Sequence, residues 1–266
     1  MAYAEGAQYA ELLRLALDQW RELEAESAAA LLTQCGGLAI GDPRRDYIGG
    51  LLASARAAGV PVEVLDWHGA HDRYPQHLLR DGEVAVFDRQ AGFLRCEPAV
   101  IAAAEQHGAT VLRHTEVDEV IERDDHLQIR GGDTVWRVRD AVVCAGAWTG
   151  RLLPVAWRRH LQARRVPQSW FAARRPEEFT PDRFPIFIRR TGVLEIYGAP
   201  TVDGVSVKVA GAVVSSPIDD PDHVERRHGP AEISAMSKAA LASVIADALV
   251  RCTEVPLDFM TPGRLG

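Results

Sequence analysis

The spacing of apolar residues at the beginning of the chain predicts two helices followed by a strand. Apolar residues that recur every three or four positions are typical of a helix with one apolar face, and here they are Tyr9, Leu12, Leu13, Ala16, Leu17, Trp20 and Leu23. The same spacing after Asp46 predicts a second helix, which should end at Gly59 because glycine favours the C-terminal cap. The apolar run Pro61–Leu65 then predicts a short strand.

The middle of the chain alternates apolar and polar residues in several short runs, which is typical of strands. Turn residues such as Gly131-Gly132-Asp133 separate the predicted strands, which lie at 109–112, 117–122, 127–130 and 134–138. A helix at 98–107 precedes them, and the apolar run Ala141–Cys144 predicts a buried strand after them. This order favours an α/β nucleotide-binding layer with an inserted antiparallel sheet.

A turn of small residues, Ala145-Gly146-Ala147-Trp148, follows that strand, and a helix should begin at Thr149. Small side chains let a ligand approach the backbone, and the first N–H groups of a helix attract phosphate. The turn is also consistent with a tight strand-to-helix connection that binds nothing.

The pattern after Pro154 predicts an antiparallel sheet, with strands at 166–172, 185–188, 193–197 and 205–209. Helical spacing returns near the C-terminus. The last predicted helix uses Ile233, Met236, Leu241, Val244, Ile245 and Leu249.

Lysine is rare in this chain, because Lys208 and Lys238 are the only two among 30 basic residues. Lys208 lies in the alternating run Val205–Val209, so it shares a strand face with Ser206 and Ala210. A lysine on the polar face of a half-buried strand is commonly just solvated. If that face borders a cavity, however, its compact charge makes it a candidate catalytic group.

Composition and charge exclude some classes of partner. The chain has 266 residues, of which 47% are hydrophobic and 25% charged, as in an ordinary globular protein. The net charge of -7 argues against nucleic acid or an anionic membrane as the main partner. No apolar run is long enough to span a bilayer and no secretory signal is evident, so we expect a cytoplasmic protein. We interpret the scattered cysteines as reduced core residues, namely Cys35, Cys96, Cys144 and Cys252.

Several familiar motifs are missing from the sequence. No two glycines are separated by a single residue, so the G-x-G-x-x-G fingerprint of a dinucleotide site does not occur. His68, His71 and His77 match no metal-binding spacing, so we interpret them as an exposed loop and expect no metal. Asp219–Asp222 is predicted to be a solvated acidic turn.

Six segments, taken in order along the chain, resemble segments of a known protein family. They are Tyr3–Gly6 with Trp20–Glu24, Thr33–Leu38, Ala91–Arg95, His107–Ala109 with His114–Val117, Ala145–Trp148, and Tyr197-Gly198 with Lys208. Together they resemble the sarcosine oxidase and N-methyltryptophan oxidase family, which consists of flavin amine oxidases of the D-amino-acid oxidase fold. The match follows the family's approximate spacing over nearly the whole chain.

The resemblance implies an α/β (α+β) fold with two domains. One is an incomplete Rossmann-like FAD-binding layer that carries a β-meander, and the other is a substrate domain built on an antiparallel sheet. The implied boundaries give a partial FAD-binding domain at 1–40 and 88–160, a substrate domain at 41–87 and 161–255, and a truncated tail at 256–266.

The implied activity is oxidation of the C–N bond of a secondary amine by FAD and O2, giving an imine and hydrogen peroxide. Lys208 matches the family lysine that promotes the oxygen reaction beside the flavin, and Tyr197 matches a tyrosine of the substrate pocket. The resemblance therefore favours a catalytic role for Lys208. The implied cofactor-binding residues are Val117, near the adenine, and Ala145, Gly146, Ala147 and Trp148, in the turn nearer the dinucleotide.

The sequence departs from the family's pattern at both ends, where the N-terminal glycine-rich unit and the C-terminal flavin segment have no counterpart. Pro256 stands where the family has its flavin-attaching cysteine, so any FAD should be bound non-covalently. Asp258 replaces a substrate tyrosine, and Ala212 replaces a histidine of close relatives.

A second hypothesis therefore stays open, in which the chain is a truncated, flavin-free remnant that acts as a binding module or has no activity. A third, a flavin-independent binder of small molecules, has no specific residue in its favour. For the first hypothesis the expected partners are a small-molecule amine and O2. A sheet that lacks its first strand would expose an edge, which predicts a homo-oligomer or a complementing polypeptide.

Overall fold

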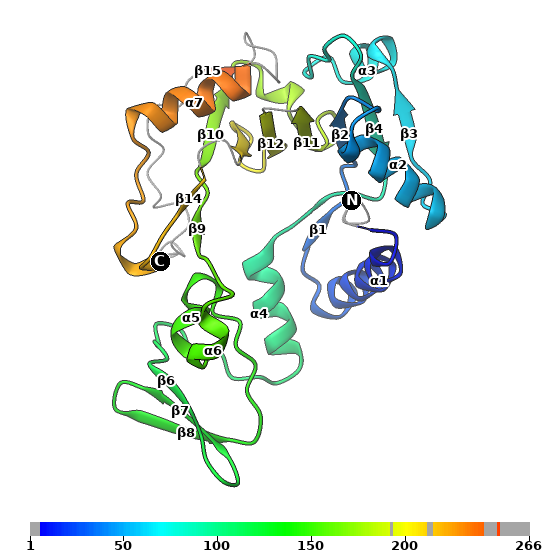
Figure 1. The fold of residues 1–266 in the computed structure, drawn as a ribbon. Helices are drawn as coiled ribbons and strands as arrows, with labels where there is room; N and C mark the ends of the chain where they lie inside the picture. The colour runs from blue at the N-terminus through cyan, green and yellow to red at the C-terminus, as the bar shows by residue number, and fades with distance from the viewer. Residues whose placement is uncertain (1–5, 192–193, 212–214, 242–248, 251–266) are drawn as a thin grey trace. The chain divides into compact units, whose positions relative to one another are not determined.

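The computed structural model describes residues 6–191, 194–211, 215–241 and 249–250 (Figure 1). By its internal contacts the chain divides into two compact units. The first comprises 1–108, 166–214 and 227–266, and the second comprises 109–165 and 215–226. This division rests on packing alone, so the boundaries expected for the FAD-binding and substrate domains stay a prediction.

The first unit is built on an eight-stranded sheet. Across the sheet the order is β15 (Leu249–Val250), β10 (Gln168–Ala173), β13 (Ser206–Gly211), β12 (Leu194–Ala199), β11 (Ile186–Thr191), β2 (Gly37–Gly41), β4 (Val84–Asp88) and β3 (Glu63–Leu65). Strands β11 and β2 run parallel, and every other neighbouring pair is antiparallel. The sheet thus joins β2, β3 and β4, from before the middle of the chain, to strands from after it.

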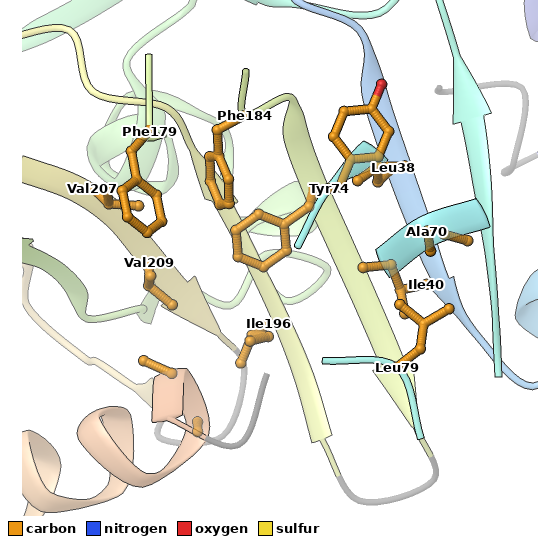
Figure 2. Packing of buried hydrophobic residues seen from close by; sticks show 14 of the residues in the cluster. Leu38, Ile40, Ala70, Tyr74, Leu79, Phe179, Phe184, Ile196, Val207 and Val209 are labelled. Atoms are coloured by element: carbon orange, nitrogen blue, oxygen red, sulfur yellow. The ribbon is translucent and has the colours of Figure 1, made fainter. Parts of the chain in front are cut away.

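One face of this sheet carries the main core, because alternate residues of each strand point to the same side. Leu38, Ile196 and Val209 lie there with aromatic rings from the connecting loops, including Phe179 and Phe184 (Figure 2). Helices α3 (Trp67–Arg73) and α7 (Pro230–Leu241) add apolar side chains to the same cluster. A core shared by residues far apart in sequence fixes the register of the strands.

The opposite face is covered at its β2 and β4 end by helix α2 (Asp46–Ala57). Ala39 and Val86 point to that side and pack against Ile48 and Leu51 of the helix. Helix α2 ends just before Gly59, whose φ of 63° suits glycine, as predicted.

Two further helices and a short ladder complete the first unit. Helix α1 (Tyr9–Ser27) contacts helix α4 (Cys96–Gln106), and strands β1 (Leu32–Thr33) and β5 (Phe93–Leu94) pair antiparallel. Helix α1 matches its prediction, yet it buries little of its apolar face within the described residues, since Leu12 and Leu15 remain exposed.

A charged pair and an unpaired histidine lie inside the main core. Arg189 of β11 is fully buried and pairs with the carboxylate of Glu83. His77 stacks on Phe184, and neither of its ring nitrogens has a hydrogen-bond partner among the described residues. Burial, aided by the charge of Arg189, lowers the pKa of His77 to about 3, so the ring is neutral.

The second unit contains the predicted meander, formed by β6 (Glu119–Glu122), β7 (Leu127–Gly131) and β8 (Thr134–Val138). It also contains short helices, η2 (Gly146–Trp148), α5 (Thr149–Leu152), α6 (Val155–Arg158) and η5 (Pro221–His223). A two-stranded ladder of β9 (Arg164–Arg165) and β14 (Ser216–Pro217) joins its two chain segments.

Two strand predictions in this unit are wrong. Residues 109–112 and 141–144 form no strand, and Val142 is 88% exposed. A strand needs a neighbour that takes up its N–H and C=O groups, and no described residue pairs with either run. Apolar character alone therefore did not decide the structure at these positions.

The predictions made for Leu249, Cys96 and Cys144 are also wrong. Leu249 lies in β15 rather than in the last helix, which ends at Leu241, and Val244 and Ile245 lie outside the described residues. Cys96 and Cys144 are exposed and Cys35 is half-buried, so the prediction of core cysteines is wrong for the first two. These three are free thiols, and Cys252 also lies outside the described part.

Candidate functional site

Lys208 occupies the middle of β13, on the face opposite the main core. Its neighbours in the strand, Val207 and Val209, point into the core, so the alternation places Lys208 on the other side. Directly across from it lie Trp170 of β10 and Ala199 of β12. The ammonium nitrogen lies 5.9 Å from the centre of the Trp170 ring, within the range of a cation–π contact.

The electrostatic surroundings of Lys208 differ from those of a solvated surface lysine. Its side chain is half-buried, and desolvation lowers its pKa below the ordinary lysine value. The nearby Cys96 thiol opposes this shift. No carboxylate in the described part of the chain forms an ion pair with Lys208. The result is a partly desolvated cation that lacks a compensating anion.

Tyr197 lies on the same sheet face as Lys208. In the register of β12 and β13, Tyr197 pairs with Ala210 and Ala199 pairs with Lys208, so all four side chains point one way. Tyr197 is 36% exposed. The glycine that follows it, Gly198, faces the core, where an added Cβ would lie 2.3 Å from the ring of Phe187. The Tyr-Gly pair thus presents a phenol on one side and permits close packing on the other.

The five predicted cofactor residues all belong to the second unit. Val117 is half-buried and precedes β6, outside any strand. The turn residues Ala145, Gly146, Ala147 and Trp148 form the η2 turn, and helix α5 begins at Thr149 as predicted. Gly146 has a φ of 54°, and an added Cβ there would meet nothing within 4 Å.

A polar network holds this turn in place. The indole nitrogen of Trp148 donates a hydrogen bond of 2.7 Å to Asp222. The guanidinium of Arg151, one turn further along, bridges Asp222 and Asp220. The run 219–222 was predicted to be a solvated acidic turn. Asp219 and Asp222 are indeed exposed, and the structure adds that Asp220 and Asp222 are engaged by Arg151, and Asp222 also by Trp148.

Two residues near Lys208 were not predicted from the sequence, namely Trp170 and Cys96. Trp170 could have been found, since the predicted strand 166–172 places it at the centre of an alternating run beside the sheet's only lysine. No sequence signal pointed to Cys96 as a neighbour of Lys208, because the two are brought together only by the packing of the first unit.

The three histidines that were predicted to share one exposed loop lie in different environments. His68 and His71 lie exposed on helix α3, whereas His77 is buried, so the prediction of one exposed loop is wrong. No group of three or more metal-ligating side chains occurs within the described ranges. The notable positions Ala212, Pro256 and Asp258 lie outside the described residues.

The sheet face that carries Lys208 fits the ring of a flavin. It offers a partly desolvated cation, which no described carboxylate pairs with, together with a phenol and an indole. Such a surface suits an aromatic system that gains negative charge on reduction. The η2 turn fits the dinucleotide end in part, because the open space at Gly146 allows close approach to the backbone. The unpaired run 141–144 before it does not supply the parallel strand that usually precedes such a turn.

The chain belongs to the FAD-dependent oxidoreductase family, whose sequence model (described as DAO, FAD dependent oxidoreductase) matches residues 1–255. FAD is the cofactor of this family. The match confirms the resemblance inferred from the six segments and, with the mixed sheet, the α/β fold class.

Among individual proteins, the chain is 27% identical over 247 residues to a monomeric sarcosine oxidase of Streptomyces avermitilis, covering 89% of this chain and 63% of that protein. It is 30% identical over 156 residues to an N-methyl-L-tryptophan oxidase of Yersinia pestis, covering 58% of this chain and 42% of the relative. This chain therefore spans less than two thirds of the length of either relative.

Solved structures show the same fold. NikD, an unusual amino acid oxidase essential for nikkomycin biosynthesis, superposes in its open form with a TM-score of 0.70 at 21% identity, covering 91% of this chain and 65% of NikD. A glycine oxidase from Geobacillus kaustophilus gives a TM-score of 0.64 at 18% identity, covering 89% of this chain and 61% of that structure. Among the described residues, no helix has the length and apolar character required to cross a bilayer.

Proposed function

We propose that this chain contributes to an FAD-dependent oxidase that oxidises the C–N bond of a secondary amine, as in the sarcosine and N-methyl-L-tryptophan oxidases that it resembles. When bound, FAD would accept a hydride from the carbon next to nitrogen and pass both electrons to O2, which gives an imine and hydrogen peroxide. Family membership supports the cofactor, and the observation that carries the reaction is the placement of Lys208.

Lys208 is the residue proposed to assist the oxygen reaction. Reduction of O2 creates negative charge on a small molecule, and a preorganised cation stabilises that charge best where water is partly excluded. Lys208 meets this requirement, because desolvation already lowers its pKa and no described carboxylate neutralises it. Its ammonium would hold the developing anion near the flavin ring.

Tyr197 is the residue proposed to contact the substrate. Its phenol lies on the face that carries Lys208 and is partly exposed, so it can contact a small amine bound over that face. Val117, Ala145, Gly146, Ala147 and Trp148 would bind the dinucleotide part of FAD. The substrate amine, O2 and non-covalent FAD remain proposals at the level of this chain.

The experiment exploits the two lysines. The protein is incubated with FAD, the bound flavin is reduced, and its reoxidation by O2 is followed in a stopped-flow spectrometer. Lys208→Met should slow reoxidation by about 100-fold, the typical effect of removing one preorganised electrostatic group. Lys238→Met, at an exposed position of helix α7, is the matched control and should leave the rate unchanged.

The results also separate the two hypotheses. Equal rates for the two variants would contradict the role of Lys208 while leaving flavin binding intact. A protein that takes up no added FAD would contradict the oxidase proposal and favour the flavin-free binding module. The lack of a paired strand at 141–144 is the observation that keeps this second candidate open.

A further inference from the structure

A pocket of about 530 Å³ lies at the start of strands β2 and β11, apart from the Lys208 face. All of its lining residues belong to the first unit. Its wall includes Tyr74 and Phe87, which are members of the main core cluster, whereas Lys208 points to the opposite side of the sheet. The volume is within the range of sites that bind small molecules, about 300–1,000 Å³.

The charges around this pocket favour an anion. Three arginines are among its lining residues, namely Arg73, Arg89 and Arg183, against two acidic residues, Glu178 and Asp182. The cavity therefore has one positive charge in excess. A single excess charge suits a monoanion better than a dianion, because a dianion would leave an uncompensated negative charge.

Two of the three arginines are available for a ligand. Arg73 is already engaged, since it pairs with Glu63 at 2.6 Å and lies over the Phe87 ring at 4.3 Å. In the described part of the chain, the side chains of Arg89 and Arg183 form no hydrogen bond or ion pair. A planar guanidinium presents two parallel donors that match a carboxylate, so each of these arginines is suited to bind one.

Gln76 forms a fixed part of the same wall. Its Nε2 donates a 2.7 Å hydrogen bond to the backbone carbonyl of Glu178, which fixes the orientation of the amide. Its Oε1 is shielded from solvent and therefore does not face the cavity. Gln76 thus holds the segment that carries Glu178 against the pocket.

We propose that this pocket binds a small monocarboxylate, with Arg89 and Arg183 holding the carboxylate. Tyr74 and Phe87 supply an apolar wall for the body of the ligand. The site is distinct from the proposed flavin face and does not depend on the oxidase proposal.

The test uses anthranilate, a fluorescent aromatic carboxylate with an amino group next to its carboxyl, titrated into the protein. Arg183→Ala and Arg89→Ala should each weaken binding about tenfold or more, as expected for loss of a hydrogen bond to a charged group. Arg174→Ala removes an exposed arginine outside the pocket and should leave affinity unchanged. Lys208→Met should also bind normally, which distinguishes this site from the sheet face.

A second measurement locates the ligand without any mutation. Cys35 lines the pocket and is half-buried, and burial raises the pKa of its thiol, so it should alkylate slowly. Saturating anthranilate should protect Cys35 from iodoacetamide at least about fivefold in peptide-resolved mass spectrometry, by steric exclusion. The exposed thiols of Cys96 and Cys144 should react at unchanged rates.

The proposal is overturned by any of four results. These are no binding of anthranilate at millimolar concentration, an equal loss of affinity in Arg174→Ala and Arg183→Ala, binding that leaves Cys35 unprotected, and tighter binding of inorganic phosphate than of anthranilate. The last result would assign the pocket to phosphate chemistry instead.

Discussion

The sheet of the first unit and the run before the η2 turn in the second unit have similar sequence patterns but different structures. Both contain short apolar runs that predict strands. In the sheet, Leu38, Ile196 and Val209 are fully buried because neighbouring strands supply both hydrogen bonds and packing. At 141–144 the run is just as apolar, yet Val142 stays exposed, because no described strand pairs with it. An apolar run therefore forms a strand only where a neighbouring strand takes up its backbone hydrogen bonds.

The largest expected effect concerns two ion pairs at adjacent positions of β11. Arg189–Glu83 is buried, whereas Arg190–Glu195 is half-exposed at 2.7 Å. Glu83→Gln should lower the free energy of unfolding by about 3–5 kcal/mol, because it removes the carboxylate charge that pairs with the buried guanidinium of Arg189. Glu195→Gln should change it by about 1 kcal/mol or less. Urea unfolding followed by circular dichroism measures both, and equal losses would contradict the assigned burial.

The second prediction compares the two apolar regions directly. Ile196→Ala should cost about 2–5 kcal/mol, the typical range for an emptied core position. Val142→Ala should cost less than about 0.5 kcal/mol, because its side chain already faces solvent. The same unfolding assay applies. A large loss of unfolding free energy in Val142→Ala would show that the run 141–144 is buried in the protein. It would contradict the contrast between this run and the strands of the sheet.

The third prediction is that the stability of the protein depends on pH through the buried side chain of His77. The folded-state pKa of His77, about 3, lies below the value of about 6.5 expected in the unfolded chain. The unfolded state therefore binds the proton first, and stability should fall as the pH drops below about 6.5, by up to roughly 1.4 kcal/mol per pH unit.

His77→Phe provides the control for this effect. It keeps an aromatic ring against Phe184 and Phe187 but removes the titrating group. The difference in stability between the two proteins should therefore vary with pH only below about 6.5. Parallel pH profiles for both proteins would contradict the buried, neutral state of His77.

The sequence predicted those elements whose pattern of apolar and polar residues is visible within a short stretch of the chain. The strands near Leu65 and Leu127, and helix α2 with its stop at Gly59, were predicted within a few residues. Alternation also put Lys208 on the face opposite Val207 and Val209. These features depend on short-range periodicity, which the sequence carries directly.

The failures have a common physical cause. The exposure of Val142, the burial of His77 and the approach of Cys96 to Lys208 all depend on what the rest of the fold places beside each residue. The contacts of Asp222 with Trp148 and Arg151 likewise join residues that are far apart in the sequence. Periodicity identifies the face on which a residue lies and not the partner that covers it.

The most direct test of the account is the pKa of Lys208. With 13C label at the ε-carbon of lysine, the protein gives two side-chain signals, and Lys238→Arg assigns the one that belongs to Lys208. A pH titration should place the Lys208 pKa clearly below the reference value of about 10.4, because its ammonium is partly removed from water and no described carboxylate compensates for this. A value at or above that reference would contradict the account, since it would describe a solvated or ion-paired surface lysine.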